Sequence, residues 1–379
     1  AGTPGLRSHR PKRNAPVAQA LINAGAIVFG KLGMHELAFG ITSNNPGFGA
    51  IHNPFDPRHV PGGSSGGSGA VVGARVVPAS LGTDTGGSVR VPAAFCGVQG
   101  FRPTVRRWSQ AGIVPISSTR DTAGPLARHA ADLAVIDTAV TGEGGTLVAK
   151  PLKGVRIGVP RGYFWEDLEQ ETAQICTAAL DALKHAGAVL VEADLPGLHP
   201  LNEAVSFTVA LFECKRELDR YLEEEGLSQR FADIVAEVAS PDVKPALASL
   251  LEPATAIPEQ AYRDAMTTHR PKLIELYRSY FAAQKVTSVV FPTTPLPAPL
   301  IGEDETVTLN GHDLPTFLTV IRNTDPGSNA GIPGISIPAG MTSGGLPVGL
   351  AFDGPPGGDR DLLSLALAVE AVLPVPRAP

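Results

Sequence analysis

Apolar and polar residues follow two kinds of pattern along this chain: short apolar runs, which predict buried strands, and longer segments with a helical period, which predict amphipathic helices. Short β-branched runs such as Val286–Phe291 are typical of buried strands. Longer segments such as Glu171–Ala186 place Ile175, Ala179 and Leu183 on one stripe, which predicts an amphipathic helix. Strands that alternate with helices indicate an α/β/α fold, in which helices cover both faces of a large mixed, mostly parallel sheet.

The other elements follow from the same periods and from turn residues. A helix is expected directly after Asn14, which we expect to cap it, with Pro16 in the first turn. Further helices are expected at Ser68–Arg75, Ser88–Phe95, 200–240, 259–284 (with a bend at Pro271) and Asp361–Leu373. Further strands are expected at Ala26–Gly30, Pro78–Gly82, Val155–Val159, Ala188–Glu192, Gly334–Pro338 and Val348–Phe352.

The domain organisation is expected to be simple. Glycine (42 residues) and proline (35 residues) are spread along the chain and not gathered in one linker, and no internal repeat is visible. We therefore expect one domain over residues 1–379, with the helical region 200–285 as an insertion or a cap within it.

Composition narrows the classes of partner and of setting. The net charge of −6 disfavours a nucleic-acid backbone as the main partner, and no apolar run is long enough to span a membrane. The three cysteines (Cys96, Cys176 and Cys214) are dispersed and odd in number, so neither a disulfide framework nor a metal site is expected. A reduced, cytoplasmic setting is predicted, without a metal or a cofactor.

Two serines in glycine-rich loops give the main chemical signal. The first loop is Pro61–Gly69 with Ser64, and the second is Asp84–Arg90 with Ser88. Glycines let backbone amides approach a ligand where a side chain would block them. Such loops suit a nucleophilic serine with hydrogen-bond donors for a developing oxyanion.

Three other interpretations of the first loop fit less well. A flexible linker would need a polar spacer, but the apolar stretch Ala70–Val72 follows directly. A phosphate-binding loop would need a following Gly-Lys-Ser/Thr, which is missing. The G-x-S-x-G elbow of an α/β-hydrolase, placed at Gly62–Gly66, would need a strand before Ser64, where the residues indicate a loop.

The second loop has the sequence of an oxyanion-binding turn. Residues 85–88 (Thr-Gly-Gly-Ser) lie between an expected strand and an expected helix, so that their amides can point towards one spot. Asp84 and Arg90 flank these residues. We expect the two side chains to form a buried ion pair that holds the shape of the loop.

Several stretches, in the right order over nearly the whole chain, resemble the amidase signature family of serine amidohydrolases. Together they are far more specific than a single glycine loop. Around residues 30–117 the chain is most similar to bacterial arylacetamide-type members. The stretches are Gly30-Lys31 with His35–Ala38, Gly62–Ser68, Gly82–Arg90, Val91–Gly97, Asp121–Pro125, Phe291–Pro295 and Gly331–Gly334.

The resemblance implies a serine–serine–lysine triad. Ser88 matches the nucleophile that forms the acyl-enzyme. Ser64 matches the bridging serine beside a cis peptide bond, which relays a proton between the nucleophile and a neutral lysine. Ser65 matches a serine that helps to organise this proton network. The residues whose amides match the oxyanion hole are Thr85, Gly86, Gly87 and Ser88.

The lysine of that triad is expected upstream of the stretch Ala1–Pro4, where this chain begins. Lys12 and Lys31 do not match the motif of the catalytic lysine, and we expect His35 to pack near the site and not to replace the base. The chain thus resembles an amidase without its N-terminal helices and its triad lysine. We expect it to hydrolyse amides poorly and to be less stable than its longer relatives, with apolar surface left uncovered.

The resemblance implies hydrolysis of the C–N bond of a small carboxylic amide, with an aryl substituent, to the carboxylate and ammonia. Two alternatives stay open: the glutaminase subunit of a tRNA-dependent amidotransferase, and a non-catalytic remnant that binds amides or a partner. The expected partner is a small amide, and a homodimer is left open. Asn323, Asp325 and Asn329 either line a pocket or serve as turn and capping residues.

Overall fold

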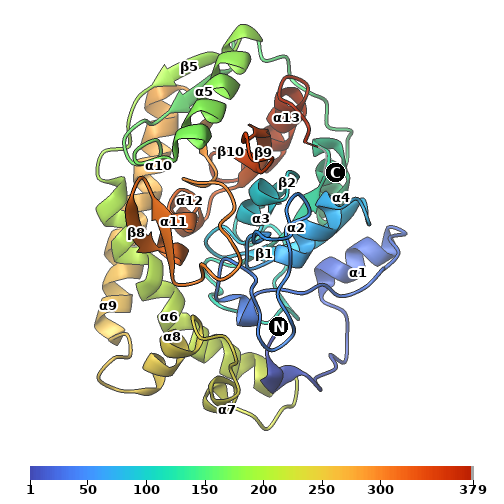
Figure 1. The fold of residues 1–379 in the computed structure, drawn as a ribbon, viewed down its shortest axis with the longest axis vertical. Coiled ribbons are helices and arrows are strands. Elements are labelled where there is room, and N and C mark those ends of the chain that lie inside the picture. The colour runs from blue at the N-terminus through green and yellow to red at the C-terminus, as the bar shows by residue number, and fades with distance from the viewer. Residues whose placement is uncertain (377–379) are drawn as a thin grey trace.

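One eight-stranded sheet runs through the centre of the computed structural model, which describes residues 1–376 (Figure 1). The strand order is β1-β3-β2-β9-β10-β6-β4-β5, and a separate two-stranded sheet pairs β7 with β8. The strands are β1 (Ala79–Asp84), β2 (Gln99–Arg102), β3 (Thr122–Ala127), β4 (Arg156–Val159), β5 (Val189–Glu192), β6 (Ser288–Pro292), β7 (Thr306–Leu309), β8 (His312–Pro315), β9 (Gly334–Met341) and β10 (Pro347–Asp353).

The large sheet is mixed, as predicted, but the prediction that it is mostly parallel is wrong. Among its described strands only β4 pairs in parallel, with β5 and with β6. The five other ladders are antiparallel. Two of the antiparallel strands, β2 and β3, were not predicted, because glycine, proline and charged residues interrupt their apolar pattern. The short connection between β9 and β10 also requires an antiparallel pair.

Helices precede, follow and cover these strands, and most of them lie close to their predicted ranges. The α-helices are α1 (Pro16–Asn23), α2 (Gly66–Gly73), α3 (Arg90–Phe95), α4 (Ala130–Thr141), α5 (Gln170–His185), α6 (Leu198–Glu224), α7 (Phe231–Ala236), α8 (Lys244–Ala248), α9 (Glu259–Asp264), α10 (Arg270–Gln284), α11 (Thr316–Ile321), α12 (Asp325–Ala330) and α13 (Asp359–Glu370).

Alternate residues of the central strands face opposite sides of the large sheet. Val290 of β6 and Phe352 of β10 belong to a core that includes α5 and α13. Their neighbours Phe291 and Ala351 belong to a different core, which includes α10. Helices therefore cover both faces, and the predicted α/β/α layering is confirmed.

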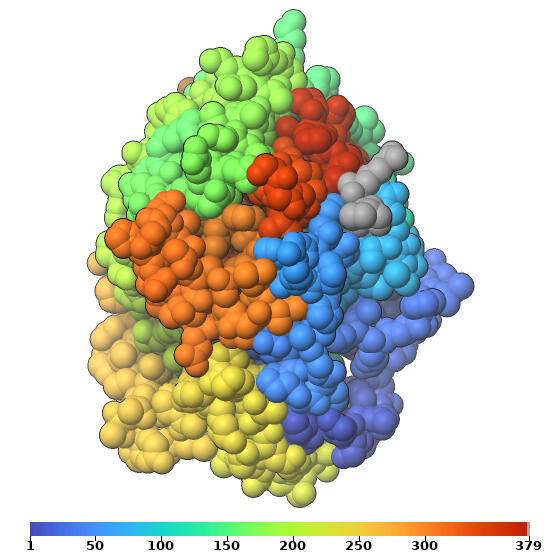
Figure 2. Space-filling model, in the orientation of Figure 1, coloured from blue at the N-terminus to red at the C-terminus, as the bar shows by residue number. Residues whose placement is uncertain are grey.

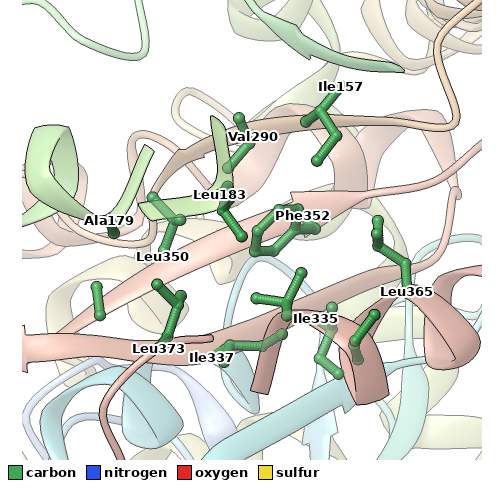
Figure 3. Packing of buried hydrophobic residues seen from close by; sticks show 14 of the residues in the cluster. Ile157, Ala179, Leu183, Val290, Ile335, Ile337, Leu350, Phe352, Leu365 and Leu373 are labelled. Carbon is green, nitrogen blue, oxygen red and sulfur yellow. The ribbon is translucent and has the colours of Figure 1, made fainter. Parts of the chain in front are cut away.

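The core under α5 and α13 is closely packed. Figure 3 shows Phe352 at its centre, with Ile335 of β9, Leu183 of α5 and Leu365 of α13 around it. Each of these side chains is at least nine-tenths buried. Such burial is the main favourable contribution to the folding free energy.

The helical region predicted at 200–285 comprises α6 to α10, of which α7, α8 and α9 lie in the lower half of the molecule in Figure 1. Leu273 and Tyr277 of α10 pack against the large sheet. Helices α6, α7 and α8 form a second core together with Leu6 and Leu37 from the N-terminal part of the chain. The predicted bend at Pro271 lies just after a π-helical turn, Ala265–His269.

Two predictions near the N-terminus are wrong. Residues 26–30 form no strand, because an apolar run becomes a strand only where another strand pairs with it, and none of the described strands does so. Ile27 and Phe29 are instead exposed, and Figure 2 shows the blue N-terminal part of the chain at the edge of the molecule. Ala15, and not Asn14, is the N-cap of α1, and the side chain of Asn14 instead donates to that of Gln19.

No helix among residues 1–376 combines the length and the apolar character needed to cross a membrane.

The three cysteines, Cys96, Cys176 and Cys214, are all buried and form no disulfide within the described chain. Burial raises the pKa of each thiol above its ordinary value. These thiols are therefore poor nucleophiles at neutral pH.

A pair of phenylalanines tests this description of the core. Phe352→Ala should lower the free energy of unfolding by about 3–5 kcal/mol, because it leaves a cavity under α5 and α13. Phe29→Ala makes the same change at a side chain that is 76% exposed, and should change this free energy by less than about 0.5 kcal/mol. Urea unfolding of both variants measures the difference, and equal losses would contradict the placement of these residues.

Candidate active site

The first serine loop is packed tightly against the N-terminal part of the chain. Ser64 is buried, and the peptide bond between Gly63 and Ser64 is cis. The carbonyl oxygen of Ser64 accepts a hydrogen bond of 2.9 Å from the amide of His35. A Cβ atom at position 67 would lie 2.4 Å from the carbonyl oxygen of Gly33, so only glycine fits there. This loop is therefore a fixed part of the fold and not a flexible linker.

The second serine loop meets the first through Ser65. The Ser65 amide donates to the carbonyl oxygen of Ser88 (3.3 Å), while the Ser65 hydroxyl donates to the carbonyl oxygen of Thr83 (3.3 Å) and accepts its amide (3.2 Å). Ser88 lies between β1 and α3 and is 9% exposed, whereas Ser64 is inaccessible. The structure thus brings the two loops and their three predicted serines together.

The amides of residues 85–88 are left without partners at this junction. Among residues 1–376, none of these four amides donates a hydrogen bond. The carbonyl oxygen of Thr85 accepts from Arg120 (3.1 Å), and that of Gly86 accepts from the hydroxyl of Thr324 (2.7 Å). In a trans peptide the N–H points away from the C=O, so the amides that follow these two carbonyls point away from Arg120 and Thr324.

The predicted ion pair between Asp84 and Arg90 is present and fully buried. The Nε and Nη2 atoms of Arg90 each lie 3.0 Å from a carboxylate oxygen of Asp84. Asp84 also accepts the amide of Val89 (3.2 Å), and the Nε atom of Arg102 lies 3.3 Å away. Burial alone would raise the pKa of Asp84, but the two guanidinium groups and the Val89 amide outweigh it and lower this pKa. Asp84 therefore stays ionised and joins the end of β1 to the residue after Ser88.

Two side chains for which the sequence predicted no role fix the Thr85 end of the loop. Asp121 accepts the hydroxyl of Thr85 (2.6 Å) and two backbone amides, those of Ile116 (2.8 Å) and Ser117 (2.9 Å). Arg120 holds the Thr85 carbonyl, as described above. Asp121 begins one of the family-like stretches, which was its only signal in the sequence, and Arg120 gave none.

The polar residues Asn323, Asp325 and Asn329 are buried in hydrogen bonds behind the loop. Asn323 donates to two backbone carbonyl oxygens. Asp325 accepts from Arg120 (2.6 Å) and from Asn329 (3.0 Å). Because all three bind neighbouring segments of the chain, these contacts favour a structural role over a pocket lining.

No described side chain is placed to take a proton from Ser64. Its hydroxyl has no hydrogen-bond partner among residues 1–376. Lys12 and Lys31 are exposed. Nδ1 of His35 accepts the amide of Ser43 at 3.0 Å, and Nε2 lies 3.0 Å from a carboxylate oxygen of Asp242 without the geometry of a hydrogen bond. His35 therefore packs beside the first loop, with its backbone amide bonded to Ser64 and its ring facing Ser43 and Asp242.

A hollow of about 630 Å³ lies elsewhere, between α6 and residues 250–257. Its walls include Phe212, Arg216 and Ile257, which belong to the helical region. The two serine loops, and not this hollow, hold the predicted chemistry and define the candidate site.

Comparisons with known proteins agree with one another. The sequence model of a family described as Amidase matches residues 1–363. An indoleacetamide hydrolase from Agrobacterium vitis is 43% identical over 98% of this chain and 80% of its own length. A mandelamide hydrolase from Pseudomonas putida is 42% identical over 98% of this chain and 75% of its own length. A crystal structure of an amidase is similar with a TM-score of 0.83 at 34% identity, over 96% of this chain and 79% of that one.

Removing the buried charge of Asp84 tests its role in the fold. Asp84→Asn should lower the free energy of unfolding by about 3–5 kcal/mol, because two buried guanidinium groups lose a shared counter-ion. Asp361→Asn is the control: this carboxylate is 72% exposed and pairs with Lys150, and its loss should cost less than about 0.5 kcal/mol. Urea unfolding near neutral pH compares the two variants.

The pH dependence of stability gives a second measurement on the same variants. Folding lowers the pKa of Asp84 below the ordinary value of 3.8, so the ionised carboxylate contributes its full stabilisation of the fold at pH values above 3.8. This contribution is lost as the pH falls through the lower pKa of the folded state. Equal losses in Asp84→Asn and Asp361→Asn would contradict the importance of the buried pair.

Proposed function

The chain belongs to the amidase family, and on this basis we propose that it hydrolyses amides through an acyl-enzyme formed on Ser88. One observation supports this proposal most: Ser88 lies at the junction of two glycine loops, in a run of backbone amides that have no partner among residues 1–376. Amide hydrolysis passes through a tetrahedral intermediate with a negatively charged oxygen. Donors that are already in place stabilise this charge without reorganisation.

We assign the oxyanion hole to the amides of Thr85, Gly86, Gly87 and Ser88. Arg120 and Thr324 hold the carbonyl groups of Thr85 and Gly86, so the amides of Gly86 and Gly87, which share these peptide planes, cannot rotate freely. Loss of one such donor costs about 10²–10³ in kcat in enzymes of this kind.

The proposed reaction has two halves. In the first, Oγ of Ser88 attacks the amide carbonyl carbon, and its proton passes through Ser64 towards a base. The C–N bond then breaks, and the leaving nitrogen takes up a proton and departs as ammonia. In the second half, water attacks the resulting ester, the carboxylate leaves, and Ser88 regains its proton.

The substrate that we propose is the primary amide of a small aryl-substituted acid. The two relatives are named as hydrolases of indoleacetamide and mandelamide, and each of these compounds is a primary amide that carries an aromatic ring. The sequence identity of 43% and 42% to these two relatives, over 98% of this chain, supports a related substrate. The expected products are the carboxylate and ammonia.

The base in this proposal is a neutral lysine, as the family resemblance implies. A lysine in this role must lose its proton, which burial favours by lowering its pKa. None of the lysines in residues 1–376 forms a hydrogen bond with Ser64. We therefore expect the 379-residue chain by itself to release ammonia slowly.

Substitution of the serines tests the proposal. Ser88→Ala should abolish the slow release of ammonia from phenylacetamide and indole-3-acetamide, and Ser64→Ala should lower the rate of this release. Ser80→Ala is the matched control, because Ser80 lies on β1 and, among residues 1–376, its hydroxyl bonds only the backbone carbonyl oxygen of Ser68. Circular dichroism should show that all variants are folded.

Covalent labelling shows whether Ser88 reacts as a nucleophile even where the turnover of amides is slow. Phenylmethanesulfonyl fluoride should modify Ser88 of the parent chain, and mass spectrometry should find no such label in Ser88→Ala. Modification of a different serine, or undiminished ammonia release by Ser88→Ala, would rule out Ser88 as the nucleophile.

A further inference from the structure

The carboxyl group of Asp353 takes no part in the reaction proposed above, yet its surroundings are unusual. Asp353 ends β10 and is 1% exposed, and neither of its oxygens has a hydrogen-bond partner among residues 1–376. The Nη1 atom of Arg90 lies 3.6 Å from Oδ1, and this nitrogen also has no hydrogen bond within the described chain. A buried carboxylate with so few partners is costly to keep ionised.

Arg90 connects Asp353 to the second serine loop. Its Nε and Nη2 atoms bind Asp84, while its Nη1 atom faces Asp353. Asp84 in turn accepts the amide of Val89, the residue directly after Ser88. A change at Asp353 therefore reaches the loop through Arg90 and Asp84.

The charge of this cluster depends on Asp353. Arg90 and Arg102 bring two positive charges, which Asp84 and an ionised Asp353 balance. If Asp353 is protonated, one positive charge is left in excess inside the protein. The backbone at Gly327 of α12 and Gly334 of β9 packs against its carboxyl group, and Tyr277 of α10, whose hydroxyl has no hydrogen bond in the described chain, is near enough to interact electrostatically with it.

We propose that Asp353 is a positioning residue, which in its ionised form holds Arg90, and through Arg90 the Ser88 loop, in the conformation that hydrolysis requires. When Asp353 is neutral, Arg90 is balanced by Asp84 alone, and Arg102 shares this same carboxylate. The effect of the charge of Asp353 on the reactivity of Ser88 rests on the proposed function. Its effect on the order of the Ser88 loop is independent of that function.

Asp353 changes its charge in an accessible pH range. Burial raises its pKa to about 6, although Arg90 and Arg102 act in the opposite direction. This value lies above the ordinary 3.8, so the folded chain binds the proton more tightly than the unfolded chain does. The contribution of Asp353 to stability is therefore present at low pH and is lost as the pH rises from about 4 through about 6.

The test compares Asp353→Asn with Asp359→Asn. Asp359 is equally buried and burial also raises its pKa, but it binds Thr104 and not Arg90. In the parent, the rate at which phenylmethanesulfonyl fluoride modifies Ser88 should rise with an apparent pKa near 6. In Asp353→Asn this rise should be absent, and near pH 8 the rate should be about tenfold lower than in the parent. Asp359→Asn should behave like the parent.

Hydrogen–deuterium exchange measures the order of the loop without chemistry at Ser88. Near neutral pH, peptides that span residues 84–95 should exchange faster in Asp353→Asn than in the parent or in Asp359→Asn. The parent alone gives a check without any variant: its exchange in 84–95, corrected for the intrinsic effect of pH, should rise below about pH 6. The melting temperature of the parent relative to Asp353→Asn should fall between about pH 4 and 6.

The two measurements separate this inference from the function on which it rests. Unchanged exchange in Asp353→Asn overturns the positioning role, as does a labelling profile equal to that of the parent. If Ser88 of the parent is not modified at any pH, the proposed function fails, and exchange alone then decides whether Asp353 orders the loop.

Discussion

The burial of two arginines next to one aspartate is the constraint on which the rest of this structure depends. Arg90 and Arg102 have no exposed surface, and a guanidinium group removed from water costs several kcal/mol unless it is paired and hydrogen-bonded. Asp84 lies between them and supplies the shared counter-charge. Nη2 of Arg90 and both terminal nitrogens of Arg102 also donate to backbone carbonyl oxygens, those of residues 120, 324, 328 and 332. Segments that would otherwise bury unpaired carbonyl groups are thereby held against the sheet.

This constraint explains how a site made of glycine-rich loops can be well ordered. Glycine loses more conformational freedom on folding than any other residue, so such loops need strong contacts to stay in one conformation. The contacts come from outside the loops: Asp84 holds the amide of Val89, Thr324 holds the carbonyl of Gly86, and Asp121 holds the hydroxyl of Thr85. Within the described part of the chain, the backbone amides of residues 85–88 donate to no other group. Leaving these amides without partners lowers the stability of the fold, but it keeps hydrogen-bond donors in place that need no rearrangement during a reaction.

The parts of the fold that the sequence predicted are those that a local pattern determines. Strands β6 and β10 and helix α5 were found because their apolar period shows within a few residues, and the serine loops because their glycines are adjacent in the sequence. Strand β3 was missed, since its buried residues include Gly124 and Pro125, and its place depends on pairing with distant β1 and β2. The opposite error occurred at Ala26–Gly30, where an apolar run has no strand beside it. The contacts of Asp353 could not be predicted either, because Arg90 is far away in the sequence and becomes its neighbour only in the folded sheet.

The segment 116–121 links the helical region to the serine loops, and this link limits how that region can move. On one side, Asp121 and Arg120 hold the hydroxyl and the carbonyl group of Thr85. On the other side, Glu213 of α6 accepts the hydroxyl of Ser117 at 2.6 Å, and Arg120 donates to the backbone of α6 at Ser206. A displacement of α6 would therefore break buried, charge-assisted hydrogen bonds or carry the segment with it. Because the same segment fixes Thr85, such a displacement would also turn the amides beside Ser88. The position of α6 and the geometry of the candidate oxyanion hole are thus physically coupled, although they lie in different parts of the chain.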